Sequence, residues 1–261
     1  MDFSITKGSH LDKWLDRIGY ENNGTLVPSE ETLAKIQYTH VTHVPYENLD
    51  IINGIPIALD INTLYDKIVT RRRGGYCFEI NALFEAMLKE AGFVTESMFA
   101  RFLRGTTGMQ MRHHRVIRVY INGESFIADA GIGQSAPRIP VKLTEGAVQI
   151  ICGEAYRFIR DPVLGYILQD LHEGKWRDFY AFTSEPQQEI DYMAASFWCE
   201  KSPDSPFGKQ RMISIKTPDG RITIDGLVLK RFSPQGVEVH ELREDEIPTI
   251  LEEYFGISGI I

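Results

Sequence analysis

The chain has 261 residues, of which 43% are hydrophobic, and a formal net charge of −8 at pH 7. This length fits one large domain or two to three small ones, with enough apolar residues for a substantial core. The acidic balance argues against nonspecific binding to nucleic acid or to an anionic membrane, because both partners need a basic surface.

The first third of the chain is predicted to be helical. Apolar residues recur at helical spacing in residues 11–18, in a segment that opens at Ser29, and after Asn62. The clearest helix begins at or near Cys77, after Gly74-Gly75, and Gly92 ends it. One face of this helix is formed by Cys77, Ile80, Phe84, Met87, Leu88 and Ala91.

From about residue 94 the hydrophobic period changes to two, which predicts a β domain. The expected strands cover residues 96–103, 115–121, 124–130, 147–152, 156–160, 164–170 and 176–182. After Pro186 the pattern becomes mixed α/β. There we expect a helix at about 187–199, a hairpin around 218–220, strands at 227–232 and 237–241, and a closing helix near 244–255.

Asn122-Gly123 predicts a two-residue type I′ hairpin, because both central residues of that turn need positive φ. Such a turn pairs residue 121 with 124, so every opposed pair sums to 245. His114 and Asp129 then lie on the same side of the sheet as diagonal neighbours, with Cβ atoms about 7–8 Å apart. His113 points to the other side, so the hairpin selects His114 of the two adjacent histidines, provided that no bulge shifts the register.

Three cysteines without paired spacing favour neither a disulfide framework nor a zinc site. Cys77 is the candidate nucleophile, because the free amides and the dipole of a helix N-terminus lower the pKa of a thiol. The simpler interpretation is a packing residue, as cysteines are often buried. Cys77, a His114 base and an orienting Asp129 would form a cysteine-protease-like triad for acyl transfer. The structural alternative is a histidine at a strand end and an aspartate that caps the following turn.

The string RGGYCFEIN at residues 73–81 resembles the active-site motif of the arylamine N-acetyltransferases. The similarity continues in order through VPYENLD at 44–50, His114, IADAGIG at 127–133, SPDSPF at 202–207 and EYFGI at 253–257, and so covers essentially the whole chain. On this resemblance Cys77, His114 and Asp129 match the catalytic triad of the family, in agreement with the hairpin count.

The resemblance implies an α+β protein of several domains. Residues 1–92 would form a helical bundle carrying the nucleophile, 93–190 a β-barrel carrying the histidine and aspartate, and 191–261 an α/β lid. It also implies that Glu47 pairs with Arg73. A bidentate bond between them would lock the loop before the nucleophile, whereas a surface pair would contribute little.

Three positions depart from the usual family pattern: Tyr46 and Ile132 replace phenylalanines, and Ser196 stands where asparagine is common. Tyr46 and Ile132 are expected to line the acceptor pocket, so the preferred amine stays open. Gly131 and Gly133 are expected to let the backbone approach the acyl group or the CoA arm closely, with a plain turn as the alternative.

The resulting prediction is a cytoplasmic enzyme without a signal peptide, a membrane span or a bound metal. It would acetylate arylamines, arylhydrazines or N-hydroxyarylamines by a ping-pong mechanism, with acetyl-CoA as co-substrate. The alternatives are a macrocyclising amide synthase of the same family, a Cys-His-Asp hydrolase, and a CoA-binding protein without activity.

Overall fold

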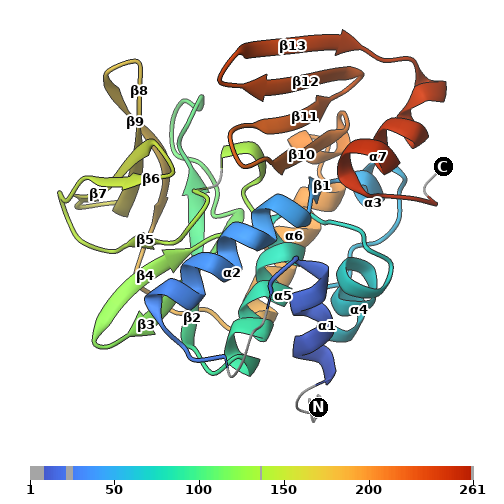
Figure 1. Cartoon of the computed structure of the whole chain (residues 1–261). Coiled ribbons are helices and arrows are strands. Elements are labelled where there is room, and N and C mark those ends of the chain that lie inside the picture. Colours follow the sequence, from blue (N-terminus) through green and yellow to red (C-terminus); the bar gives the residue numbers. More distant parts are fainter. Residues whose placement is uncertain (1–8, 22–25, 136, 260–261) are drawn as a thin grey trace.

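The computed structural model describes residues 9–21, 26–135 and 137–259. Figure 1 shows a group of helices beside a large curled sheet, with a second sheet lying along the top of the view. This mixed architecture confirms the predicted combination of helices, barrel and α/β segment. Among the described residues, no helix is long and apolar enough to cross a bilayer.

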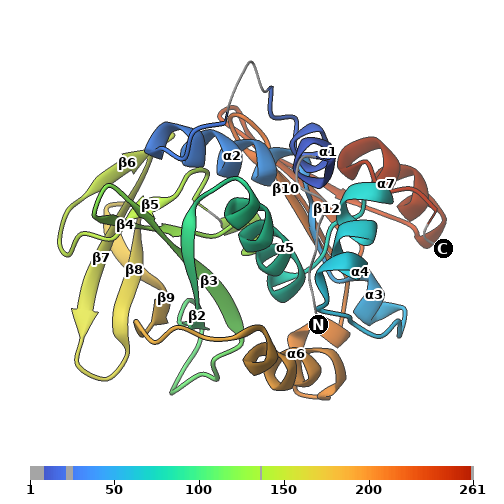
Figure 2. The ribbon, with the colours of Figure 1, turned by 90° about the horizontal axis from the view of Figure 1, so that it is seen from below.

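The predicted helices of the first third are present. They are α1 (Ser9–Arg17), α2 (Glu30–His43), α4 (Ile61–Tyr65) with the π-helical turn η1 (Asp66–Thr70), and α5 (Cys77–Glu90). Ser29 caps α2 by accepting the N–H of Thr32 at 3.1 Å. Helix α5 lies between the barrel strands on one side and α1 and α4 on the other (Figure 2). Eleven of its fourteen residues are buried, as expected for a helix that is apolar on most of its circumference.

Eight strands form the barrel, in the order β5-β4-β3-β2-β9-β8-β7-β6. Their bounds are β2 (Val94–Phe102), β3 (His114–Ile121), β4 (Glu124–Ala128), β5 (Val141–Lys142), β6 (Gln149–Ile151), β7 (Glu154–Asp161), β8 (Gly165–His172) and β9 (Lys175–Phe182). All seven predicted strands are present, and the two-residue β5 was not predicted. The barrel is nearly closed, because the Gln149 side chain of β6 bonds both backbone groups of Lys142 in β5, at 2.9 and 2.8 Å.

The hairpin of β3 and β4 has the predicted register. Ile121 pairs with Glu124 and Ile117 pairs with Ala128, so each pair sums to 245. Asn122 and Gly123 both have positive φ, 51° and 81°, as a type I′ turn requires. The register is uninterrupted over the paired residues 117–121 and 124–128, and His114 and Asp129 lie just beyond them.

A second, five-stranded sheet has the order β1-β10-β11-β12-β13. The strands are β1 (Tyr46–Glu47), β10 (Met212–Lys216), β11 (Arg221–Asp225), β12 (Val228–Ser233) and β13 (Gly236–Glu241). Helix α6 (Tyr192–Lys201) precedes β10 in the chain, and α7 (Ile247–Phe255) ends the α/β segment. Strand β1 and the short helix α3 (Leu49–Ile52) were not predicted, because elements of two and four residues are too short to show a hydrophobic period.

Buried clusters cross the predicted domain boundaries. Leu49 of the first segment packs with the apolar residues of the C-terminal sheet and α7, such as Ile213 and Leu251. Tyr192 of α6 packs in turn with the residues around Cys77. The division into 1–92, 93–190 and 191–261 stays a prediction, and the second sheet takes its edge strand from the first of these segments.

Candidate active site

The proposed histidine and aspartate meet inside the barrel wall. His114 is the first residue of β3, and Asp129 directly follows β4. The Nε2 atom of His114 lies 2.7 Å from Oδ2 of Asp129, and both side chains are buried. An ionised carboxylate can only accept, so Nε2 carries the hydrogen and Nδ1 presents a lone pair. Within the described residues, the buried Nδ1 has no hydrogen-bond partner.

Cys77 reaches the same place from α5. Its Sγ lies 3.7 Å from the carbonyl oxygen of His113, the residue directly before His114. Its Cα would lie 3.0 Å from a Cβ added at Gly131, two residues after Asp129. The start of α5 therefore packs directly against the segments that carry the histidine and the aspartate.

His113 is directed elsewhere. Its Nδ1 bonds the carbonyl oxygen of Met111 at 2.8 Å, and its ring packs near Phe102 and Trp198. The hairpin count correctly identified His114 as the histidine that meets Asp129.

Asp129 is held by groups that the sequence did not single out. Its Oδ1 accepts the Asn81 amide at 2.9 Å and the N–H of Gly131 at 3.0 Å. Gln37 accepts the backbone N–H of Asp129 at 3.0 Å. Asn81 could have been found, because it lies four residues after Cys77 and so on the same helix face. Nothing in the local sequence indicated Gln37.

The prediction that the helix N-terminus lowers the pKa of Cys77 was wrong as a net effect. Burial raises the pKa of this thiol well above its ordinary value, and the neighbouring Cys199 and Asp129 raise it further. The N–H of Phe78 at the start of α5 acts in the predicted direction. The loss of solvent is larger than this effect, so a base must remove the proton when the sulfur reacts.

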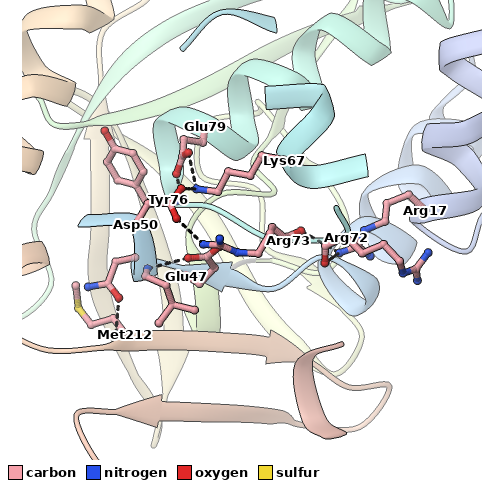
Figure 3. Close-up of polar contacts among 11 residues, drawn as sticks. Arg17, Glu47, Asp50, Lys67, Arg72, Arg73, Tyr76, Glu79 and Met212 are labelled. Carbon is pink, nitrogen blue, oxygen red and sulfur yellow. Dashed lines mark hydrogen bonds and ion pairs between the residues drawn. The ribbon is translucent and has the colours of Figure 1, made fainter. Parts of the chain in front are cut away.

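The predicted pair of Glu47 and Arg73 is present and buried (Figure 3). Nη2 and Nε of Arg73 both donate to the same oxygen, Oε1 of Glu47, at 2.8 and 3.0 Å. The other oxygen accepts the N–H of Leu49 at 2.8 Å. The bond is thus not the two-oxygen fork that we predicted, and the alternative of an ordinary surface pair is wrong because Glu47 is fully buried.

Three further residues extend this pair into a buried ion cluster, which we define as Glu47, Asp50, Lys67, Arg73 and Glu79 (Figure 3). Asp50 lies 2.8 Å from Arg73 and 2.7 Å from Lys67, which lies 2.7 Å from Glu79. The cluster joins the loop before the nucleophile to the first turn of α5. It holds three carboxyl groups against two cations, so one negative charge is left over.

Glu79 is the carboxylate of the cluster that is protonated most easily. Burial, together with the nearby Glu47, raises the pKa of the Glu79 carboxyl from 4.5 to about 7, although Lys67 opposes the shift. Between pH 4.5 and 7 the folded protein therefore binds a proton here that the unfolded chain releases. Stability contributed by this proton is present below pH 4.5 and is lost as the pH rises through 7.

The Glu79→Gln variant is expected to lose this pH dependence, because an amide does not titrate. From pH 8 to pH 5 the wild type should gain about 3 kcal/mol in free energy of unfolding relative to the variant. Urea unfolding of both proteins at the two pH values measures this difference, and Glu253→Gln on the exposed face of α7 is the control. Parallel pH profiles of Glu79→Gln and the wild type would contradict the assignment.

The loop between Arg71 and Cys77 is fixed at several points. Arg17 of α1 donates to the carbonyl oxygens of Arg72 and Arg73 at 3.2 and 3.1 Å. A Cβ at Gly74 would lie only 1.9 Å from the carbonyl oxygen of Pro45, so no larger residue fits there. The hydroxyl of Tyr76, the residue before Cys77, bonds Ser196 of α6. Ser196, which departs from the family pattern, therefore contacts the residue next to the nucleophile.

An open cleft of about 330 Å³ lies between the barrel and the second sheet. Tyr46, Ile132 and Gly133 form part of its wall. Their roles toward the acceptor and the donor stay predictions. The barrel adds Phe102, Arg104 and Phe179, and the second sheet adds residues 212–214, 223–225, Lys230 and Phe232. The ring of Phe102 also packs on His114, at 5.0 Å between ring centroids, so the cleft lies beside the histidine.

At Gly131 and Gly133, close packing leaves little room for a side chain. A Cβ at Gly131 would lie 2.9 Å from Asn81 and 3.0 Å from Cys77. Gly133 has φ +67°, and a Cβ there would lie 3.1 Å from the Tyr46 ring. The close approach that we predicted is therefore made to the protein itself, and contact with CoA stays a prediction.

The match to known sequences covers nearly the whole chain. A family model described as N-acetyltransferase matches residues 30–259. The chain is 33% identical over 238 residues to the arylamine N-acetyltransferase / N-hydroxyarylamine O-acetyltransferase of Salmonella typhimurium, over 89% of this chain and 84% of that protein. It is 32% identical to an arylamine N-acetyltransferase of Mycobacterium tuberculosis, over 95% of this chain and 89% of that protein.

Solved structures agree with these sequence matches. The arylamine N-acetyltransferase of Salmonella typhimurium has a TM-score of 0.90 and 30% identity, over 95% of this chain and 91% of that chain. The enzyme of Mycobacterium marinum in complex with CoA has a TM-score of 0.88 and 30% identity, over 95% and 92%. Sequence and fold agree, and the chain belongs to the arylamine N-acetyltransferase family of acyltransferases.

Proposed function

We propose that this enzyme transfers the acetyl group of acetyl-CoA to an aromatic amine through an acetyl-cysteine on Cys77. The observation that carries the proposal is the buried bond between His114 and Asp129 beside the start of α5. It leaves Nδ1 of His114 with a free lone pair, while Cys77 is a thiol that needs a base. The names of the relatives and the CoA complex of the Mycobacterium marinum enzyme support donor and acceptor.

In the first half-reaction His114 takes the proton of the Cys77 thiol, and the sulfur attacks the thioester carbonyl carbon of acetyl-CoA. The new C–S bond forms on Cys77, and the bond to the CoA sulfur breaks. The leaving thiolate takes the proton from His114. Asp129 keeps the imidazole in the required tautomer and stabilises the imidazolium while it exists.

In the second half-reaction the amine nitrogen attacks the acetyl-cysteine. His114 takes a proton from the nitrogen, the C–N bond forms, and Cys77 leaves as a thiolate that regains its proton. The backbone amides of the first turn of α5 are the donors that we assign to the developing oxyanion. The N–H of Phe78 already acts on the sulfur, which supports this assignment.

Both substrates would enter from the cleft beside Tyr46 and Ile132. Its apolar wall, with Phe102 and Phe179, suits the ring of an arylamine, an arylhydrazine or an N-hydroxyarylamine. Gly131 and Gly133 would border the donor. We infer the cytoplasm as the compartment, because free cysteines persist under reducing conditions.

Incubation with acetyl-CoA alone, without any amine, tests the proposal. One acetyl group should be added, with release of one equivalent of CoA, and peptide mass analysis should place it on Cys77. The Cys77→Ala variant should gain nothing, because the sulfur that would carry the acetyl group is absent.

The outcome separates the alternatives. A stable acetyl-Cys77 that an aniline discharges as an N-acetyl product supports the proposed transfer. Rapid loss of the adduct to water without dependence on amine would indicate a hydrolase. No adduct, or one that survives Cys77→Ala, would exclude the mechanism.

A further inference from the structure

A second hollow, of about 400 Å³, lies next to the cleft. The barrel contributes the β6–β7 turn, residues 152–154, and the second sheet contributes the tips of two hairpins, residues 218–221 and 232–237. Three cations, Arg138, Lys216 and Arg221, line it together with the carboxylates of Glu154 and Asp219.

Arg138 uses its donors on the protein itself. Its guanidinium bonds Glu154 at 2.9 Å and the carbonyl oxygens of Thr217 and Gly220 at 3.2 and 2.8 Å. Glu154 is therefore already paired. Asp219 lies at the exposed tip of the β10–β11 turn, where its Oδ1 accepts from Thr217.

Lys216 and Arg221 lack comparable partners. The Lys216 side chain is 3% exposed, and within the described residues its one ion-pair contact, with Glu154, is 4.0 Å long. Arg221 bonds Gln134 through Nε at 3.3 Å and stacks on Phe232. Lys216 and Arg221 also face each other directly across β10 and β11, and such like-charged pairs destabilise a sheet.

Burial of an unpaired ammonium group costs free energy that an anion would recover. Consistent with this, burial lowers the pKa of Lys216 to about 8, and Arg138 and Arg221 lower it further, although Glu154 opposes them. A bound dianion would reverse this shift. The chemistry that fits two facing cations in a small hollow is a phosphate group.

The hollow adjoins the cleft. Phe232 belongs to the walls of both, and it lies opposite Arg221 on the neighbouring strand. Gln134, which accepts from Arg221, also lines the cleft. A donor molecule that places its thioester near Cys77 can therefore extend past Phe232 toward Lys216.

We propose that Lys216 and Arg221 form a subsite for a phosphate monoester, supplied by the 3′-phosphate of acetyl-CoA. This assignment rests on the proposed function, because it takes CoA to be the donor. Arg138 holds the two turns in place and adds positive charge, and Phe232 separates the phosphate from the reacting end of the donor.

Titration calorimetry with CoA and with dephospho-CoA tests the subsite without any acyl transfer. The wild type should bind CoA about 100-fold more tightly than dephospho-CoA, because each of the two cations contributes about tenfold. Lys216→Met and Arg221→Gln should each weaken CoA about tenfold and leave dephospho-CoA unchanged. Arg231→Gln, an exposed arginine outside both hollows, is the matched control and should bind both ligands like the wild type.

Inorganic phosphate distinguishes the source of the anion. It should weaken CoA binding and leave dephospho-CoA binding unaffected. Phosphate that binds at Lys216 while the wild type treats the two ligands alike would assign the hollow to free phosphate and overturn the proposal.

Equal losses for both ligands in Lys216→Met and Arg221→Gln would overturn it too. Arg221 is half-buried, so its variant tests the subsite even if Lys216→Met fails to fold. The result is independent of the acetyl-cysteine experiment. Binding that depends on the 3′-phosphate, with no acetyl adduct, would keep the subsite and exclude the mechanism. An acetyl adduct on Cys77, with equal binding of CoA and dephospho-CoA, would keep the mechanism and exclude the subsite.

Discussion

Replacement of His114 by alanine is expected to lower kcat/KM for acetyl transfer by about 10³- to 10⁴-fold, because the buried Cys77 thiol then has no base. The alanine removes the only described side chain that bonds Oδ2 of Asp129. Rates with acetyl-CoA and an aniline measure the loss, and circular dichroism checks that the variant is folded. The acetyl adduct should also disappear on the time scale on which the wild type acetylates fully.

The neighbouring histidine is a matched control. His113→Ala should keep activity within about threefold of the wild type, because its side chain bonds only the Met111 carbonyl among the described residues. The backbone oxygen that contacts Cys77 remains in that variant. Equal losses in the two variants would show that the hairpin as a whole, and not the imidazole of His114, matters for activity.

Replacement of Arg73 by methionine is expected to destabilise the protein by about 3–5 kcal/mol, as measured by urea unfolding. The variant would leave the buried carboxylates of Glu47 and Asp50 without their guanidinium partner. This loss is a large part of the free energy of unfolding of a typical domain, which is about 5–15 kcal/mol. Activity should fall in parallel, because the same residue fixes the loop before Cys77.

Arg71→Met provides the comparison within the same loop. Arg71 pairs with Asp66 at 2.9 Å, but both side chains are more than half exposed. Removal of such a pair should change the free energy of unfolding by about 0.5 kcal/mol or less. If both variants lose the same amount, the cost comes from the loop sequence and not from the buried ion cluster.

The His114→Ala and Arg73→Met predictions concern different parts of the active site. The pair of His114 and Asp129 lies on the barrel hairpin, and Asn81 of α5 bonds the Asp129 carboxylate. The nucleophile is held by the ion cluster, which links the first segment to α5. The proposed reaction needs the Cys77 thiol and the His114 imidazole close together. It therefore depends on the contact between α5 and β3.

Much of this site followed from local sequence. Asn122-Gly123 determined the turn, the turn determined the register, and the register placed His114 beside Asp129. The periodicities of three and four and of two predicted most helices and strands, because each reflects which side of an element faces the core. The errors concern short elements, β1, α3 and β5, in which too few residues exist to show a period.

Other properties depended on contacts between distant segments. The sequence suggested a thiol with a lowered pKa, and only the packed structure shows that burial outweighs the helix amides at Cys77. The sequence suggested one ion pair, and the structure contains a buried cluster of five charged groups that includes Arg73. Gln37, which bonds Asp129, carried no local signal, and Ser196 was noted only as a departure from the family pattern, without its bond to Tyr76.

The sequence by itself determined the family, the order of the elements and the three residues proposed for chemistry, because these depend on motifs and on interactions between near neighbours in the chain. Tertiary structure alone decided how deeply each charge is buried, which ions meet, and where Lys216 and Arg221 face each other without a full set of partners. Desolvation and ion pairing depend on every atom around a group, and segments far apart in the chain supply those atoms.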